Sequence, residues 1–169
     1  ILCICEGAAE MDIMNMLLEN NRLIFTNEEL IDNKVHKRKS ASSIEQEFLA
    51  YDHGGEVLIL RVLDSKNEKF PLSKAYRDRF DIVTVNTNPE IEILLVIARN
   101  GIDDYLKTAS SEKPSIYCKR AYKMTDLKRQ GFMRAYFSDI EHLICVLWEP
   151  KTKFGSGRLT IFDLLRYSC

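Results

Sequence analysis

The sequence predicts an α/β protein with a mainly parallel sheet flanked by helices. Short apolar runs alternate, over the first hundred residues, with stretches whose apolar residues recur every three or four positions. This alternation favours parallel strands joined by helical crossovers. The chain has 169 residues, enough for one domain with a substantial core. We therefore expect a single domain, with an α/β core over 1–100 and a mainly helical extension over 101–169.

Three strands are expected. The first two are mostly apolar runs, of the kind found in strands buried on both faces, and the third is DIVTVN; each is followed by a polar turn. They cover 1–5, 57–64 and 81–86. The segment between the first two contains the polar, basic run VHKRKS (35–40), which we expect to be an exposed loop.

Helices are expected between and after the strands. The first covers 8–20, and the second begins at Ser42, where Glu45 completes a capping box. Pro89 is expected in the first turn of a third helix. In the helical extension, Trp148 lies in an apolar run and is expected in the core.

Composition limits the class of protein. The formal net charge is -1, so no global positive field points to nucleic acid, and such binding would need local basic patches. No run approaches 18 apolar residues, and the first apolar run is too short for a secretory signal. The five cysteines contain no CxxC pair and are expected to be free thiols. These features predict a cytoplasmic protein.

Acidic residues follow the expected strands. Glu6 comes directly after the first strand, Asp64 ends the second, and Glu90 and Glu92 follow the third. Parallel strands bring their carboxyl ends to one edge of a sheet, where α/β proteins bind ligands. Carboxylate oxygens are the ligands that Mg²⁺ prefers. The sequence therefore predicts an acidic cluster at this edge, although chance placement of acids in loops remains the alternative.

Three motifs in this order resemble a known family. They are CEGAAE with Glu6, Gly7 and Glu10, the apolar strand that closes on Asp64, and NTNPEIEILLVI. The arrangement resembles the Toprim fold of topoisomerases, DnaG-type primases and nucleases of the overcoming-lysogenization-defect group. The third motif is similar to a segment of RloB-like proteins, small defence-associated members of that group. The resemblance covers roughly residues 1–100.

The resemblance implies a nuclease that hydrolyses DNA or RNA with Mg²⁺ or Mn²⁺, in phage defence. It also implies a homo-oligomer or a partner ATPase, and no membrane. Its catalytic residues would be Glu6, Glu10, Asp64 and Glu92, and its metal ligands Glu6 and Asp64 with Glu68. Glu10 would act as a further ligand or as the base that orients a water. Glu90 competes with Glu92, but at the start of a helix a carboxylate is also explained by the helix dipole.

One position departs from the family pattern. The family's second motif is Asp-x-Asp, whereas this chain has Asp64-Ser65-Lys66. Lys66 would compete with a metal, so Asn67 or Glu68 would have to supply the missing oxygen. Alternatively, Lys66 would hold a phosphate directly. Two functions therefore stand: a metal-dependent nuclease, or a non-catalytic Toprim-like module that binds nucleic acid, a nucleotide or a partner protein.

Basic clusters are the candidates for contact with nucleic acid. They comprise Lys37, Arg38 and Lys39 in one segment, Lys119 and Arg120 in another, and Lys66 beside the acids. Tyr117, Tyr122 and Phe132 lie near the second cluster and would suit stacking on unpaired bases. The alternative is that these charges form a solvated face and that the aromatic residues belong to the core.

Overall fold

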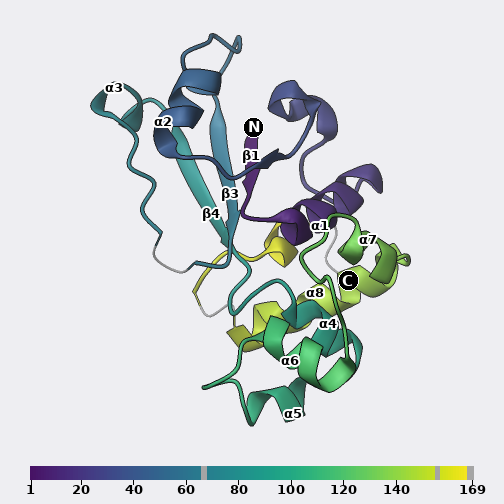
Figure 1. Ribbon diagram of the computed structural model, residues 1–169. Coiled ribbons are helices and arrows are strands. Elements are labelled where there is room, and N and C mark those ends of the chain that lie inside the picture. Colours follow the sequence, from purple (N-terminus) through teal and green to yellow (C-terminus); the bar gives the residue numbers. More distant parts are fainter. Residues whose placement is uncertain (66–67, 155–156, 167–169) are drawn as a thin grey trace.

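The protein is built around a four-stranded, wholly parallel sheet. The computed structural model describes residues 1–65, 68–154 and 157–166. The strand order is β2-β1-β3-β4, with β1 at Leu2–Cys5, β2 at His36–Lys37, β3 at Leu58–Leu63 and β4 at Asp81–Asn86 (Figure 1). The three predicted strands and the α/β class are confirmed. Because β1 and β3 are neighbours in register, the carboxyl ends of both open on the same edge.

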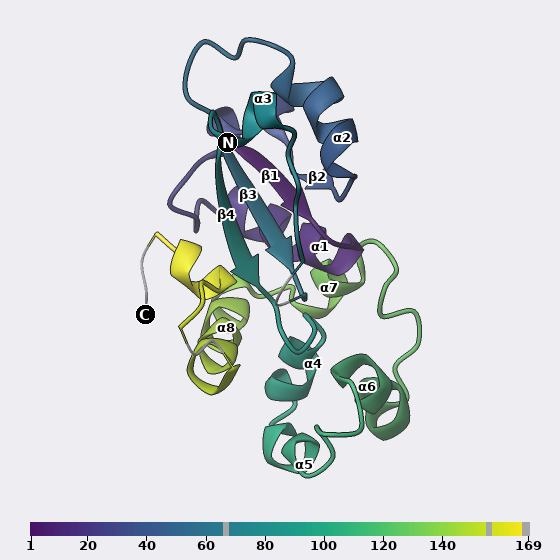
Figure 2. The ribbon, with the colours of Figure 1, turned by 90° about the vertical axis from the view of Figure 1, so that its left-hand side faces the viewer.

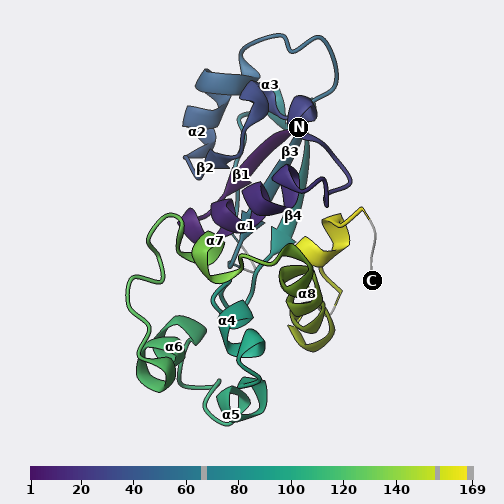
Figure 3. The ribbon, with the colours of Figure 1, turned by 90° about the vertical axis from the view of Figure 1, so that its right-hand side faces the viewer.

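Helices cover both faces of this sheet. The helix α1 (Ala8–Glu19) lies on the face turned toward the viewer in Figure 3, and α2 (Ala41–Ile44), continued by the π-helical η3 (Glu45–Leu49), packs on the other. Side chains of β1 alternate between the two cores, as the strand period requires. Cys3 and Cys5 belong to the α1 core, and Leu2 and Ile4 to the second core.

The helices from α4 to α8 gather beyond the carboxyl edge of the sheet, which lies at its lower end in Figure 2. The helix α4 packs against α6 and α8, and α7 packs against α1. Their bounds are α4 Ile93–Ala98, α5 Ile102–Leu106, α6 Pro114–Tyr122, α7 Phe132–Tyr136 and α8 Ile140–Phe154. Shorter elements are η1 Asn27–Glu29, η2 Ile31–Asn33, α3 Lys74–Arg77 and η4 Ile161–Leu164. The helix-rich C-terminal part is therefore confirmed, and it closes the sheet edge at which the acids were predicted.

The prediction that VHKRKS (35–40) is an exposed loop holds for residues 38–40, but it was wrong for the first part of the segment. His36 and Lys37 form the edge strand β2, which pairs with Ile4 and Cys5. His36 is buried, its Nε2 lies 3.1 Å from the carbonyl oxygen of Ile31, and its ring meets that of Phe48 edge to face. Backbone pairing with a central strand thus overrides a polar local sequence.

Two predicted helix starts were also wrong. Ser40, not Ser42, caps α2, since its Oγ accepts a hydrogen bond from the backbone nitrogen of Ser43 at 3.2 Å. The helix after β4 begins at Ile93 rather than at Pro89, because residues 89–92 form a turn.

Trp148 is not a core residue. Its side chain is 52% exposed on α8, where its ring packs against Phe162 at 4.9 Å between centroids. Among the described residues, no helix has the length and apolar character needed to cross a membrane.

Candidate functional site: a carboxylate pocket at the sheet edge

A cavity of about 200 Å³ lies at the carboxyl ends of β1 and β3. Five acidic side chains line it, together with the cation of Lys128; the acids are Glu6, Glu10, Asp64, Glu90 and Glu92. We call this cavity the carboxylate pocket. Four of the five acids are those expected to be catalytic, so the sheet brings together residues far apart in the sequence.

Glu6 and Asp64 are placed by adjacent strand ends. The backbone nitrogen of Glu6 donates to the carbonyl oxygen of Val62 at 3.0 Å, which extends the ladder between β1 and β3 by one step. In return, the backbone nitrogen of Asp64 donates to Glu6 Oε2 at 2.9 Å. This reciprocal pairing fixes both acids at the mouth of the same crevice.

Glu10 is placed by the first turn of α1. Its Oε2 accepts a hydrogen bond from the backbone nitrogen of Gly7 at 3.1 Å, which turns the side chain back toward the strand end. A β-carbon at Gly7 would lie 3.2 Å from that same oxygen, so the glycine leaves room for the carboxylate. Glu10 is only 6% exposed, which makes it the most buried acid on the α1 side of the pocket.

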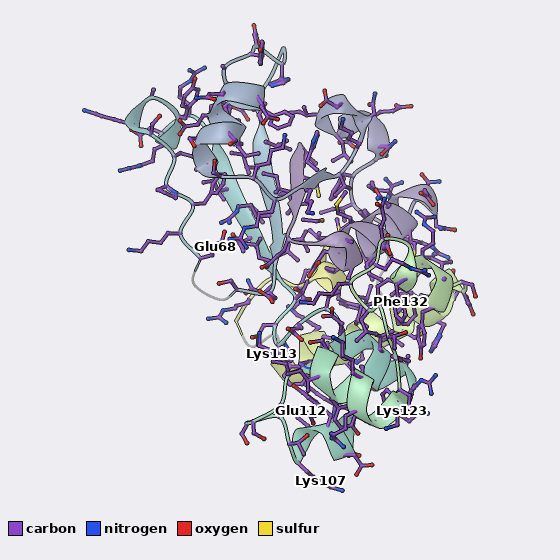
Figure 4. The ribbon with its side chains drawn as sticks, viewed as in Figure 1. Glu68, Lys107, Glu112, Lys113, Lys123 and Phe132 are labelled. Carbon is purple, nitrogen blue, oxygen red and sulfur yellow. The ribbon has the colours of Figure 1, made fainter. Side chains whose placement is uncertain are left out.

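Glu90 and Glu92 come from the turn that joins β4 to α4, and both are buried. Glu90 Oε2 accepts a hydrogen bond from the backbone nitrogen of Ser115 at 3.1 Å, and its Oε1 lies 3.5 Å from Lys113 Nζ. Lys113 lies just before α6, below the sheet edge (Figure 4). The expected explanation of Glu90 by a helix dipole is therefore wrong, because the helix begins three residues later and Glu90 is held by α6 instead.

Burial, together with the crowded negative charge, raises three pKa values in the pocket. Burial, together with the charges of Glu92 and Glu6, raises the pKa of Glu10 to about 7, although the hydrogen bond from Gly7 opposes the shift. Burial and the adjacent Glu6 raise the pKa of Asp64. Burial, and then Glu90 and Asp64, raise the pKa of Glu92, while Lys128 opposes the shift. Such mutually repelling acids mark candidate functional sites.

Beside this pocket lies a second, wider hollow of about 710 Å³, to which Glu6 also contributes. We call it the Arg38 hollow; it is lined by Glu6, Arg38, Lys39, Ser40, Ala41, Ser42, Glu68, Lys69, Phe70 and Pro71. Arg38 stands at the boundary, with Nη1 3.0 Å from Glu6 Oε1 and Nη2 2.8 Å from Glu68 Oε2. The other Glu68 oxygen pairs with the buried Arg61, which sequence reasoning missed. In the sequence, Arg61 is marked only as one charged residue inside an otherwise apolar run.

Glu68, expected to be a metal ligand, lies on the loop that follows β3 and lines the Arg38 hollow rather than the carboxylate pocket (Figure 4). Lys66, expected to bind phosphate, lies outside the described residues. Lys37 is exposed on β2, and Lys39 pairs with Glu47. Arg38 therefore is the one cation of that basic segment in direct contact with a predicted catalytic acid.

The second basic cluster does not reach the pocket. Lys119 is exposed on α6 beside Lys123, and Arg120 forms two hydrogen bonds with Glu112, at 2.9 and 2.8 Å. Tyr117 is buried, and Tyr122 and Phe132 pack against the same core. The alternative that these aromatic residues belong to the core is therefore correct, and they are not free stacking surfaces. In Figure 4, Glu112 and Lys123 lie well below the level of Glu68.

The donor chemistry of the carboxylate pocket suits a hard divalent cation, since every acidic ligand offers oxygen. Within the described ranges, however, no group of three or more His, Cys, Asp or Glu side chains is already arranged to hold a metal ion. In this structure the two carboxylate oxygens of Glu6 are taken by Arg38 and by the Asp64 backbone. Coordination would require Glu6 to exchange Arg38 for the cation.

Comparisons with protein-family models, curated proteins and solved structures found no match to this chain.

Proposed function

We propose that this protein is a metal-dependent phosphodiesterase that acts on DNA or RNA. The observation that carries the proposal is the convergence of five carboxylates on one small cavity at the carboxyl edge of a parallel sheet. Folding alone does not favour such a cluster, because burial, and then the repulsion between the acids, raises the pKa values of Glu10, Asp64 and Glu92. A cation bound among them would relieve that repulsion.

The residues divide into three roles. Glu6, Asp64 and Glu92 would hold Mg²⁺ or Mn²⁺, which when bound supplies Lewis-acid polarisation of a phosphodiester. Glu10, which is 6% exposed beside these ligands, would accept a proton from the attacking water. Lys128, the cation that lines the pocket, would face a non-bridging oxygen of the phosphate.

The Toprim-type resemblance, in its RloB-like branch, belongs to the same proposal. It is supported by the positions of Glu6, Glu10, Asp64 and Glu92 around one cavity. A role in phage defence, with a partner ATPase or a second copy, follows from that resemblance alone. The pair Glu6 and Arg38 adds a restriction, since the metal would bind only after Arg38 has been displaced.

A nuclease assay tests the proposal. Purified protein is incubated with single- and double-stranded DNA and RNA in the presence of Mg²⁺, Mn²⁺ or EDTA. We expect cleavage only with a metal, and a loss of at least about a hundredfold in Glu6→Gln and in Asp64→Asn. Glu28→Gln, which changes an exposed acid outside the pocket, is the matched control. Cleavage that persists in EDTA, or that Glu6→Gln leaves unchanged, would defeat the mechanism.

A non-catalytic module is the second candidate. It is favoured by the engagement of both Glu6 oxygens and by the lack of a preformed metal cluster among the described residues. On this view Arg38 neutralises Glu6 permanently and the surface only binds. Tight binding of a nucleic acid, without cleavage under any metal condition, would support it.

A further inference from the structure

We propose that the Arg38 hollow is a single-strand nucleic-acid subsite, in which Phe70 stacks on a base and Arg38 and Lys69 bind the adjoining phosphate. This inference rests on the proposed function, since it names the substrate class for the same site. The hollow has the volume of a small-ligand pocket, about 710 Å³, and shares Glu6 with the carboxylate pocket. A strand lying in it would lead directly to the acids.

The charge of the hollow suits a phosphate. Three cations line it, Arg38, Lys39 and Lys69, against the two acids Glu6 and Glu68. Arg38 remains 44% exposed although it touches both acids, so its guanidinium is accessible to an incoming anion. Lys69 is exposed beside it. A planar guanidinium binds phosphate through two parallel hydrogen bonds, which repays the loss of its contact with Glu6.

The exchange would also free the catalytic acid. Glu6 Oε1 is held by Arg38 at 3.0 Å, so a phosphate that takes over Arg38 releases this oxygen for the pocket. Glu68 keeps its other partner, the buried Arg61, and therefore stays in place when Arg38 turns away. Binding of the strand and completion of the pocket are thereby linked through one side chain.

Phe70 supplies the aromatic surface. Its half-buried ring packs partly against the core on the α2 face but, unlike Tyr122 and Phe132, also lines the hollow. The guanidinium carbon of Arg61 lies 4.4 Å from the ring centroid. Arg61 is 3% exposed and is paired with Glu68, so the ring rests on a fixed cation. Bases that stack on an aromatic ring must be unpaired, whereas a duplex keeps its bases stacked on one another. The combination of cations with a fixed ring therefore selects a single strand.

Binding measured in EDTA tests the subsite separately from hydrolysis. The probes are a fluorescent single strand of about twelve nucleotides, a blunt duplex of the same sequence, and a labelled mononucleotide. We expect the single strand to bind more tightly than either other probe. Phe70→Leu should weaken it roughly tenfold or more, since leucine keeps apolar bulk but cannot stack. Phe70→Tyr should retain binding.

Phe80→Leu is the matched control. The Phe80 ring is also half-buried beside an arginine, with the guanidinium carbon of Arg79 5.5 Å from the ring centroid, but it does not line the hollow. Lys69 is exposed, so Lys69→Gln should not disturb folding. This change should reduce the magnitude of the slope of log K against log salt concentration by about 0.7. Equal affinity of Phe70→Leu and wild type, or tighter binding of the duplex or the mononucleotide, would overturn the subsite. A strand that binds through Phe70 but is never cleaved would instead overturn the proposed hydrolysis alone.

Discussion

Glu6 Oε2 accepts a hydrogen bond from the backbone nitrogen of Asp64 at 2.9 Å, although the two residues are 58 positions apart along the chain. The bond holds the two loops that follow β1 and β3 at one distance from each other. Each residue thereby depends on the other for its position. A change at Glu6 is consequently expected to alter both the charge of the carboxylate pocket and the path of the backbone at Asp64, which is why the isosteric Glu6→Gln is preferred to alanine.

Glu10→Gln should make the protein more stable at alkaline pH. The pKa of Glu10 is raised to about 7, so the native state holds its proton more tightly than the unfolded chain. Stability from this group is therefore complete below about pH 4.5 and is lost as the pH rises through about 7. At pH 8 the charged form costs on the order of 3 kcal/mol, which glutamine avoids. Urea unfolding of both proteins at pH 5 and pH 8 measures the difference.

Glutamine can still accept the hydrogen bond from Gly7, so the start of α1 should be preserved in this variant. The gain at pH 8 should shrink toward zero at pH 5. An equal change in unfolding free energy at both pH values would show that Glu10 is not titrating in this range. Glu28→Gln, at an exposed position, should leave the pH profile unaltered.

Mg²⁺ or Mn²⁺ should stabilise the wild-type protein against heat. A ligand present at a hundred times its dissociation constant adds about 2.7 kcal/mol to the free energy of unfolding. For a chain of this length that corresponds to a rise of several degrees in Tm. Glu6→Gln should abolish most of the rise, whereas Glu28→Gln should retain it. Calorimetry at constant ionic strength separates this effect from screening, and an undiminished rise in Glu6→Gln would place the cation elsewhere.

Arg61→Met should destabilise the fold by roughly 2 kcal/mol, because it removes a buried partner of Glu68 and the cation beneath Phe70. The loss is limited because Glu68 keeps Arg38. Arg134→Met provides the comparison: Arg134 also binds a glutamate, Glu19, but both side chains are exposed. That change should cost less than about 1 kcal/mol. Equal costs in urea unfolding would contradict the role assigned to burial.

Gly101→Ala should be destabilising by about 1–3 kcal/mol, because a β-carbon there would overlap the hydroxyl oxygen of Tyr122. That hydroxyl is buried and has no hydrogen-bond partner among the described residues. Tyr122→Phe should therefore be neutral or stabilising by itself. In the double variant the phenylalanine should recover part of the loss. Additive unfolding free energies of the two single variants would show that the residues do not meet.

Most of the fold could be predicted because the central strands carry their own signal. The run that became β1 is apolar throughout, and the run that became β3 is apolar except for Arg61, as is typical of strands buried on both faces. The strand β2 could not be predicted, since two residues of a basic segment become a strand only through pairing with Ile4 and Cys5. Trp148 was misplaced for a related reason: an apolar run predicts a helix but does not say which face is covered.

The sequence predicts those pocket residues that directly follow a predictable strand. Glu6 and Asp64 follow apolar strands directly, so the parallel arrangement alone brings them together. Glu90 was judged from a helix start that lies elsewhere, and its contact with Ser115 depends on how α6 packs. The pairing of Arg38 and Arg61 with Glu68 is recognisable only in three dimensions, because the three residues lie far apart or on different elements of the chain.

During translation, β1 is synthesised long before its neighbour β3. The ribosome must add all residues up to the end of β3 before the ladder from Leu2 to Cys5 can close, which takes roughly 3 to 12 seconds at ordinary elongation rates. No hairpin offers a local nucleus in a sheet whose strands are all parallel. Until then the edge of β1 that pairs with β3 stays open, so we expect aggregation of the nascent chain to begin at this apolar strand.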